Sequence, residues 1–371
     1  MENVSIGESP SRPARSMADV LAIAWAALLT LVGLALVVFG AVRLVAGLAG
    51  EALLSDWLPP LLAIAAGGAI LARYARVWVG VLGRREYTLA RDTMRTDVVQ
   101  AILLAILAVV LFPLLWILSM SLDPRSFSRP TGLTIIPPGA TLDAYISVIT
   151  RPSPNPVSFP RLLANSLLVA GGTAALAVVV GTSAAYAFSR LVFPGRRLGM
   201  LGFVLVLMIP PGGTLAPLFV LLNALRLRTT LVGLAIAYAS SALPFAIWNM
   251  KGFIDSLPYD LEEAAQVDGC TRSQAFRRVI LPLATPGMAV TALMGFLTGW
   301  SEFILAWTFL SDPQTFTLPM VLRGMVGQYA SGTPWSQFAA LSIMMSLPAV
   351  ILFFLLQRYL VAGLAAGGVK G

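Results

Sequence analysis

Residues 101–119 read AILLAILAVVLFPLLWILS and contain no charged side chain. A helix needs about 20 such apolar residues to cross the hydrocarbon core of a bilayer. The rest of the chain has a similar composition, since 58% of its 371 residues are hydrophobic and only 11% are charged. A soluble protein carries about 25% charged residues. The sequence therefore predicts an all-α, polytopic membrane protein.

Apolar blocks of this kind recur along the chain and predict about eight transmembrane helices. They cover roughly residues 20–40, 57–71, 101–119, 162–188, 198–222, 231–250, 287–310 and 338–356. The second block is the shortest of the eight. No small-residue cleavage site follows the first block, so we expect a retained helix and not a removed signal peptide.

Lysine and arginine are unevenly divided between the two sets of alternate loops. One set, which includes both termini, holds 17 of these residues and the other holds 8. Cytoplasmic loops carry the excess of basic residues in membrane proteins. We therefore expect a multi-pass protein of the plasma or inner membrane with both termini in the cytoplasm.

Composition also excludes several kinds of site. The net charge of +8 is spread between the apolar blocks and forms no single patch for nucleic acid. The chain has no His and one Cys, so we expect no metal cluster, disulfide framework or His-based catalysis. Its two lysines, Lys251 and Lys370, lie outside any G-x-x-x-x-G-K-[ST] loop. We expect no cofactor on this chain and no ATP bound through such a loop.

One connection between predicted spans, residues 251–284, is too polar to be inserted and reads KGFIDSLPYDLEEAAQVDGCTRSQAFRRVILPLA. Asp255 or Ser256 can cap a first helix, and Asp268-Gly269 can end it because glycine adopts the left-handed conformation of a helix terminus. Thr271 to Gln274 is a capping-box pattern that predicts a second helix. Leu281-Pro282 then ends that second helix. The sequence predicts two short helices joined at a glycine.

The apolar residues of this connection leave two interpretations open. They are Leu261, Ala264, Ala265, Phe276, Val279 and Ile280. Small residues such as Ala264 and Ala265 allow close approach, which suits a knob that docks into a cleft on another protein. The same pattern also fits an amphipathic helix that lies at the membrane interface.

The spacing of this segment resembles the EAA signature of ATP-binding-cassette importer permeases. The match comprises Glu263-Ala264-Ala265, three residues, Gly269, nine residues, Val279, one residue and Leu281-Pro282. Val279 stands where the family usually has Ile. The resemblance implies a type I importer permease core of six helices. It further implies that this loop, Asp268 included, is the coupling helix that inserts into a separate ATPase subunit, with Glu263 as the contact residue and Gly269 as the turn.

The C-terminal residues 357–371, QRYLVAGLAAGGVKG, resemble the tail of maltose-type permeases of the MalG-like kind. Asn165-Ser166 and Trp300-Ser301-Glu302-Phe303 are similar to that family too, although it more often has Asn at the position of Ser301. The resemblance implies that Gly367, Gly368, Lys370 and Gly371 reach the interface of the ATPase dimer. A short tail that frays is the alternative.

The same resemblance predicts the organisation of the chain and its partners. We expect an N-terminal extension with two transmembrane helices at residues 1–95 and a permease domain at residues 96–371. The coupling loop covers 253–284 and the tail covers 357–371. The expected partners are a second, MalF-like permease, a homodimeric ATPase that binds ATP and Mg, an extracytoplasmic sugar-binding protein and membrane lipid.

Five residues are candidates for the translocation pathway. Pro210-Pro211, before two glycines, predicts a kinked or unwound segment, a feature that often marks a gate in transporters. Glu302 is a carboxylate at membrane depth, and such groups face either protein or a water-filled path. Asn165 and Asn249 can bind sugar hydroxyls, yet polar residues also hold helices together.

The resemblance thus implies a permease subunit, not an enzyme, of an ABC importer for maltose, maltodextrin or a related α-glucoside such as trehalose. The alternative is an ion-coupled secondary transporter that works without an ATPase. That alternative predicts internal repeats and intramembrane carboxylates, and only Glu302 fits. A membrane enzyme would need a catalytic constellation, and we recognise none.

Overall fold

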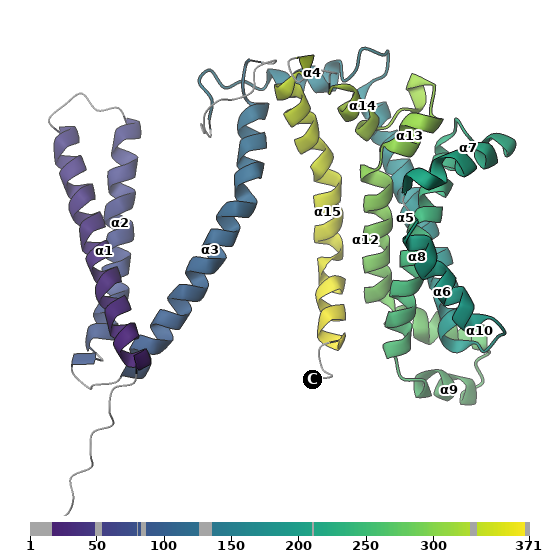
Figure 1. Cartoon of the computed structure of the whole chain (residues 1–371), viewed down its shortest axis with the longest axis horizontal. Helices are drawn as coiled ribbons and strands as arrows, with labels where there is room; N and C mark the ends of the chain where they lie inside the picture. Colours follow the sequence, from purple (N-terminus) through teal and green to yellow (C-terminus); the bar gives the residue numbers. More distant parts are fainter. Residues whose placement is uncertain are drawn as a thin grey trace, which may run out of the picture. The chain divides into compact units, whose positions relative to one another are not determined.

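The computed structural model describes residues 17–48, 54–79, 81–82, 87–125, 136–209, 211–326 and 332–367. All regular secondary structure in these ranges is helical. The chain divides into two compact units, Met1–Phe112 and Pro113–Gly371, whose helices are drawn in Figure 1. The division falls inside helix α3, Tyr87–Ser121. The boundary expected between residues 95 and 96 stays a prediction.

The first unit contains α1, Met17–Leu48, packed along α2, Leu54–Val79. Glycines allow this close packing, because a Cβ atom on Gly67 would lie only 2.5 Å from the carbonyl oxygen of Gly33. Close approach at small residues is a common basis for helix association in membranes. Asp97 of α3 adds a polar contact, with Oδ1 2.6 Å from Nη2 of Arg73 on α2.

Three long helices form the core of the second unit. They are α5, Phe159–Arg190, α8, Leu231–Ser256, and α12, Thr285–Ser301. A Cβ on Gly299 of α12 would lie 2.8 Å from Oγ1 of Thr173 on α5, so only glycine permits this contact. The last helix, α15, Trp335–Gly367, packs against α12.

Shorter elements lie at the two ends of this core (Figure 1). One end carries α9, Asp260–Val267, and α10, Arg272–Ala275, followed by a π-helical turn at Phe276–Ile280 and α11, Leu281–Leu283. The opposite end carries α4, Asp143–Thr150, α13, Ile304–Phe309, a 3₁₀ turn at Pro313–Thr315 and α14, Leu318–Gly324. Between α5 and α8 the chain forms α6, Arg196–Leu207, a 3₁₀ turn at Pro211–Thr214 and α7, Leu215–Ala224.

Six of the described helices are long and apolar enough to cross a membrane. They are α1, α2, α3, α5, α8 and α15. A seventh span results if Arg272–Leu283 and Thr285–Ser301, which are bent by 75° at their junction, count as one. These helices confirm the all-α polytopic fold. Each of the six contains one of the eight predicted apolar blocks.

The two remaining blocks are not single continuous helices. Residues 198–222 are broken between α6 and α7, as the proline and glycine residues at 210–213 predicted, and Pro210 itself lies outside the described residues. Residues 287–310 are broken where the prediction had one helix. There α12 ends at Ser301, because Glu302 adopts an extended backbone with φ −76° and ψ 135°.

Candidate functional site

The element α9–turn–α10 confirms the predicted pair of short helices joined at a glycine. Gly269 has a φ of +88°, a left-handed conformation that glycine adopts without strain. Its amide donates to the carbonyl of Gln266 at 3.0 Å and thereby satisfies a free carbonyl at the end of α9. Thr271 and Gln274 form the predicted capping box, with backbone-to-side-chain distances of 2.8 and 3.3 Å.

The start of the first helix differs from the prediction. Neither Asp255 nor Ser256 caps α9, because α8 continues through Ser256 and the N-cap residue of α9 is Tyr259. The side chains of the two predicted caps bind within or beside α8 instead. Ser256 Oγ donates to the carbonyl of Phe253 at 2.7 Å, while the Asp255 carboxylate accepts from Ser189 Oγ at 2.6 Å and pairs with Lys251.

The end of the second helix lies one residue beyond the predicted Leu281-Pro282. Helical backbone continues through a π turn at Phe276–Ile280 to Leu283. The wider turn precedes Pro282, which has no amide hydrogen to donate. The chain then bends by 75° into α12. The loop is therefore joined directly to a core helix of the bundle.

The predicted apolar side of this element is divided between two faces. Ala265 and Ile280 are buried in the protein, and the Phe276 ring lies 4.4 Å from the ring of Tyr186, centroid to centroid. Leu261 and Ala264 are on the outer face. Val267 beside them is 87% exposed. The outer face is thus a small apolar surface on a short helix.

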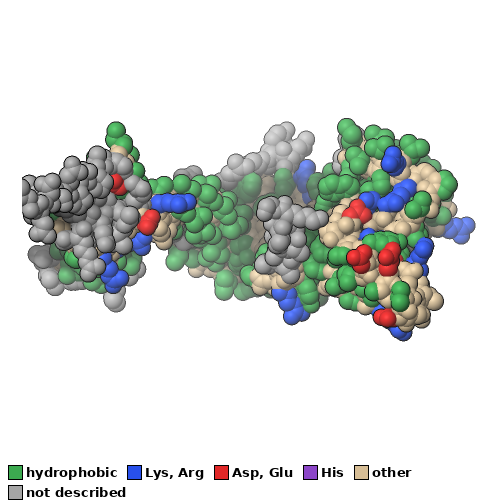
Figure 2. All heavy atoms as spheres, turned by 90° about the horizontal axis from the view of Figure 1, so that it is seen from below, with side chains coloured by type: hydrophobic (Ala, Val, Ile, Leu, Met, Phe, Trp, Pro, Cys, Tyr) green, Lys and Arg blue, Asp and Glu red, His purple; other side chains and the backbone are tan. Residues whose placement is uncertain are grey.

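Charged side chains surround this outer surface. The exposed acids are Asp260, Glu263 and Asp268, and the exposed bases are Arg272, Arg277 and Arg278. Figure 2, viewed from the end that carries α9 and α10, shows acidic and basic side chains close together over this element. Among the predicted coupling residues, Glu263, Ala264, Asp268, Gly269 and Pro282 are exposed, Leu281 is half-buried and only Ala265 is buried.

The structure also shows a residue that the sequence reasoning missed. Glu262 is 2% exposed, although its neighbour Glu263 faces outward. Its Oε2 atom lies 3.4 Å from Nε of Arg190 at the end of α5, and its Oε1 atom accepts a hydrogen bond from the Tyr186 hydroxyl. Glu262 lies three residues before the buried Ala265, and residues at this spacing share a helix face. This three-residue spacing is the sequence signal that could have identified Glu262 as an inward-facing residue.

The polar pathway candidates within the core helices have protein partners. Asn165 is 1% exposed and donates both amide hydrogens, to the carbonyls of Gln314 at 2.8 Å and Phe316 at 2.9 Å. Asn249 of α8 donates to Thr291 Oγ1 of α12 at 3.2 Å. These contacts tie segments together. A pathway role for either residue stays a prediction.

Glu302 lies in the break between α12 and α13. Its Oε1 atom accepts from the amide of Ile304 at 2.7 Å, and its Oε2 atom accepts from the amide of Leu305 at 3.1 Å. A carboxylate in this position satisfies the free amides at the start of α13. Its backbone carbonyl accepts from the Tyr238 hydroxyl at 3.1 Å. Pro211 begins the 3₁₀ turn between α6 and α7.

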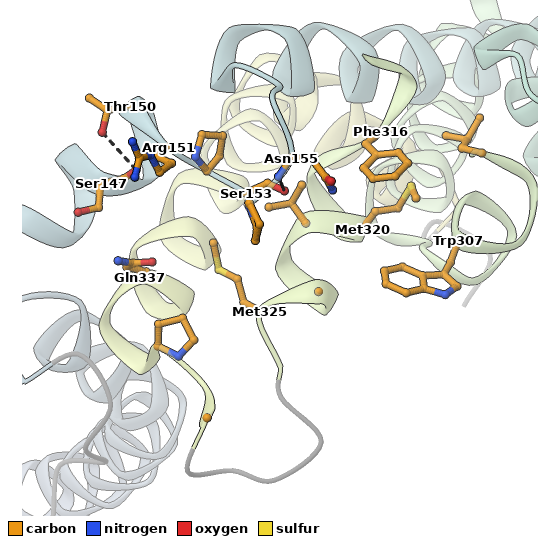
Figure 3. A pocket seen from close by; sticks show the side chains of 17 residues that line it. Ser147, Thr150, Arg151, Ser153, Asn155, Trp307, Phe316, Met320, Met325 and Gln337 are labelled. Carbon is orange, nitrogen blue, oxygen red and sulfur yellow. Dashed lines mark hydrogen bonds between the residues drawn. The ribbon is translucent and has the colours of Figure 1, made fainter. Parts of the chain in front are cut away.

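A cavity of about 1130 Å³ is lined by residues of α4, α13 and α14 and of the start of α15. These elements lie at the end of the unit opposite α9 (Figure 1). Its lining combines polar side chains with aromatic and methionine side chains. Figure 3 shows Arg151 and Gln337 toward one end of the cavity and Phe316 and Trp307 toward the other. Hydrogen-bonding groups beside aromatic faces are suited to polar ligands with apolar ring faces.

The C-terminal tail is described only in part. Helix α15 extends through Gly367 and runs toward the end of the unit that carries α9 (Figure 1). Gly368, Lys370 and Gly371 lie outside the described residues. The predicted contact of the tail with an ATPase stays a prediction.

Comparisons with known proteins agree with these features. Residues 156–365 match the family described as binding-protein-dependent transport system inner membrane component. The chain is 37% identical to the trehalose transport system permease protein SugB of Mycobacterium tuberculosis, over 70% of this chain and 93% of that protein. It is 35% identical to the galactooligosaccharides transport system permease protein GanQ of Bacillus subtilis, over 73% and 94% of the two chains. It is 33% identical to the trehalose/maltose transport system permease protein MalG of Thermococcus litoralis, over 75% and 100%.

A solved structure shows the same fold. A chain of a bacterial ABC transporter that imports the acidic polysaccharide alginate superposes with a TM-score of 0.60 at 23% identity, over 73% of this chain and 98% of that one.

The family match and the sequence relatives identify a multi-pass protein of the inner membrane that works with other ABC importer components, including a substrate-binding protein. It belongs to the binding-protein-dependent transport system inner membrane component family and is the permease subunit of an ABC carbohydrate importer, not itself an ATPase.

Proposed function

We propose that this chain is the MalG-like permease of an importer for maltose, maltodextrin or a related α-glucoside such as trehalose. Its relatives include a trehalose permease and a trehalose/maltose permease, which support the α-glucoside class. The tail sequence at residues 357–371 favours the same group. The chain has a similar sequence identity to a galactooligosaccharide permease. The uptake measurement must therefore include other oligosaccharides as alternative substrates.

The element α9–turn–α10 is the proposed docking site for the ATPase subunit. The observation that carries this proposal is its exposed outer face, with Glu263, Ala264 and Gly269 at the surface of a capped turn. Val267 is 87% exposed, and a protein cleft would remove this apolar side chain from water. Acidic and basic residues around it provide charge pairs that orient a partner.

The proposed assembly contains this chain, a second MalF-like permease, a homodimeric ATPase and an extracytoplasmic sugar-binding protein. ATP and Mg bind the ATPase. Closure of the ATPase dimer moves the α9–α10 element, and the bend at residues 283–285 passes the movement to α12. Both termini and the α9–α10 end then lie in the cytoplasm, and the tail with Gly367, Gly368, Lys370 and Gly371 reaches the ATPase dimer.

Two hollows of the structure are candidate binding surfaces for the sugar. With α9 in the cytoplasm, the 1130 Å³ cavity lies at the extracytoplasmic face, where sugar arrives from the binding protein. A smaller pocket of about 370 Å³ lies between α5, α8 and α12 and is lined by Ser241, Thr291, Thr298 and Ser301 among others. These four hydroxyl groups donate to backbone carbonyls of their own helices, and their oxygen atoms can accept hydrogen bonds from a sugar.

Ion-coupled transport without an ATPase is the competing function. It needs an intramembrane carboxylate that is free to bind the ion. The Glu302 carboxylate is engaged by the amides of Ile304 and Leu305, which argues against a role in carrying an ion.

The test is uptake by the complete importer reconstituted in vesicles, with labelled trehalose, maltose and a galactooligosaccharide offered in turn. We expect uptake of trehalose or maltose that requires ATP and stops when the ATPase subunit is catalytically inactive. Uptake that persists with the inactive ATPase and follows an ion gradient would support the competing function. Uptake of the galactooligosaccharide alone would overturn the sugar assignment.

A further inference from the structure

The adjacent residues Glu262 and Glu263 face opposite sides of α9. Glu263 is exposed, whereas Glu262 is 2% exposed and contacts the end of α5. A buried carboxylate is costly unless a charge and hydrogen bonds compensate it. The environment of Glu262 supplies both, from residues far away in the chain.

Arg190 is the centre of this environment and is itself 8% exposed at its side chain. Its Nη2 atom donates to the carbonyls of Ile254 at 3.0 Å and Leu257 at 2.8 Å, at the C-terminal end of α8. Its Nε atom faces Oε2 of Glu262 on α9 at 3.4 Å. One guanidinium, on the last residue of α5, therefore joins α5, α8 and α9.

Two aromatic residues complete the set. The Tyr186 hydroxyl donates to Oε1 of Glu262 from one turn earlier on α5. The Arg190 guanidinium carbon lies 5.2 Å from the centre of the Tyr259 ring, a cation–π distance. Neither Arg190 Nε nor Glu262 Oε2 has a hydrogen-bond partner among the described residues, so each of these atoms depends on the opposite charge.

We propose that Glu262 and Arg190 form the mechanical link that transmits movement of the α9–α10 element to α5. Glu263 faces the ATPase, and Glu262 holds the inner side of the same helix to the membrane bundle. Arg190 is a positioning residue that acts through Glu262. The inference rests on the proposed docking of the ATPase at α9.

The two faces predict two different defects. Loss of the outer contact weakens association with the ATPase. Loss of the inner link leaves the ATPase bound but lets α9 move without α5, so ATP is hydrolysed with little transport. The measured quantity is the number of sugar molecules imported per ATP hydrolysed. Loss of folded protein lowers uptake and ATP hydrolysis together and leaves this ratio unchanged, whereas a coupling defect lowers the ratio.

The experiment uses the complete importer in vesicles, with labelled trehalose, or maltose if the unmodified importer does not accumulate trehalose. We expect Glu262→Gln to retain the ATPase subunits in normal amount and to lower the sugar imported per ATP about tenfold. Arg190→Lys, which loses the planar fork, should lower it too. The matched control is Arg196→Gln. Arg196 donates to the carbonyls of Phe188 and Ser189 at the same end of α5, so this control should keep the ratio unchanged.

Tyr186→Phe keeps the ring and removes only the hydroxyl donor to Glu262, so it tests the link even if Glu262→Gln fails to assemble. We expect it to lower the ratio about twofold to fivefold. Normal ratios in Glu262→Gln, Arg190→Lys and Tyr186→Phe would overturn the link. Glu263→Lys removes the outer contact and should weaken association with the ATPase. An equal loss of ATPase association in Glu262→Gln would overturn the division between the two faces. Normal ATPase association in Glu263→Lys would instead refute the proposed docking site.

Discussion

Two carboxylates of this permease illustrate two different uses of the same group. Glu262 on α9 contacts Arg190 and Tyr186, which lies 76 residues earlier in the chain. Glu302, between α12 and α13, accepts hydrogen bonds from amides two and three residues ahead of it. Glu262 connects separate segments, whereas Glu302 shapes the chain locally. A rigid link between segments can transmit movement, and a local cap fixes only the direction of the chain.

The comparison predicts its largest effect at Arg190. Arg190→Ala leaves the Glu262 carboxylate buried without its charge partner, which should lower the free energy of unfolding by about 3–5 kcal/mol. The measurement is the unfolding midpoint of the purified importer in detergent. Arg197→Ala, at an exposed site in the first turn of α6, is the control and should change stability by less than about 0.5 kcal/mol. Equal effects at the two positions would show that Glu262 does not need Arg190.

Two tyrosine hydroxyls provide a matched pair for the same comparison. Tyr186 donates to the Glu262 carboxylate, and Tyr238 donates to the backbone carbonyl of Glu302. Hydrogen bonds to charged groups contribute about 1.5–3 kcal/mol and neutral ones about 0.5–1.5 kcal/mol. Tyr186→Phe should therefore destabilise the importer more than Tyr238→Phe in the same unfolding assay. The reverse order would contradict the proposed link through Glu262.

The turn after α9 tests whether the outer face needs a fixed shape. A valine at residue 269 must adopt the left-handed conformation, at a cost of about 1–2 kcal/mol, although no atom lies within 4 Å of the added Cβ. We expect Gly269→Val to weaken retention of the ATPase on affinity-tagged permease. Gly269→Asn, which tolerates that conformation better, should retain more. Full retention in the valine variant would mean that docking does not depend on this turn.

The smallest effect is expected at Glu302. Glu302→Gln keeps one side-chain acceptor for the amides of α13 and should cost about 1 kcal/mol, the difference between a charged and a neutral hydrogen bond. Initial uptake should stay within about twofold of the unmodified importer, since we propose a local structural role. Complete loss of uptake in a stably assembled importer would give Glu302 a role in the pathway.

The sequence was sufficient for the features that depend on local pattern. Apolar blocks predicted the helices of the bundle, and Gly269 with the Thr271–Gln274 capping box predicted the short helices of the loop. It was insufficient where the outcome depends on distant partners. Nothing near Glu262 indicates that Arg190 and Tyr186 will meet it, and Asp255 binds Ser189 of another helix instead of capping α9. The break at Glu302 was missed because the apolar residues on both sides of this carboxylate do not show that it will cap a new helix.

The one cysteine of the chain gives direct access to the proposed contact between the α9–α10 element and the ATPase. Cys270 follows the Gly269 turn and is partly exposed. A thiol-specific photo-crosslinker attached to Cys270 in the unmodified permease can be activated in the assembled importer. We predict crosslinks to the ATPase subunit, which Glu263→Lys should reduce. Crosslinks to lipid or to the other permease alone, in a complex that still contains the ATPase, would show that the α9–α10 element does not bind the ATPase.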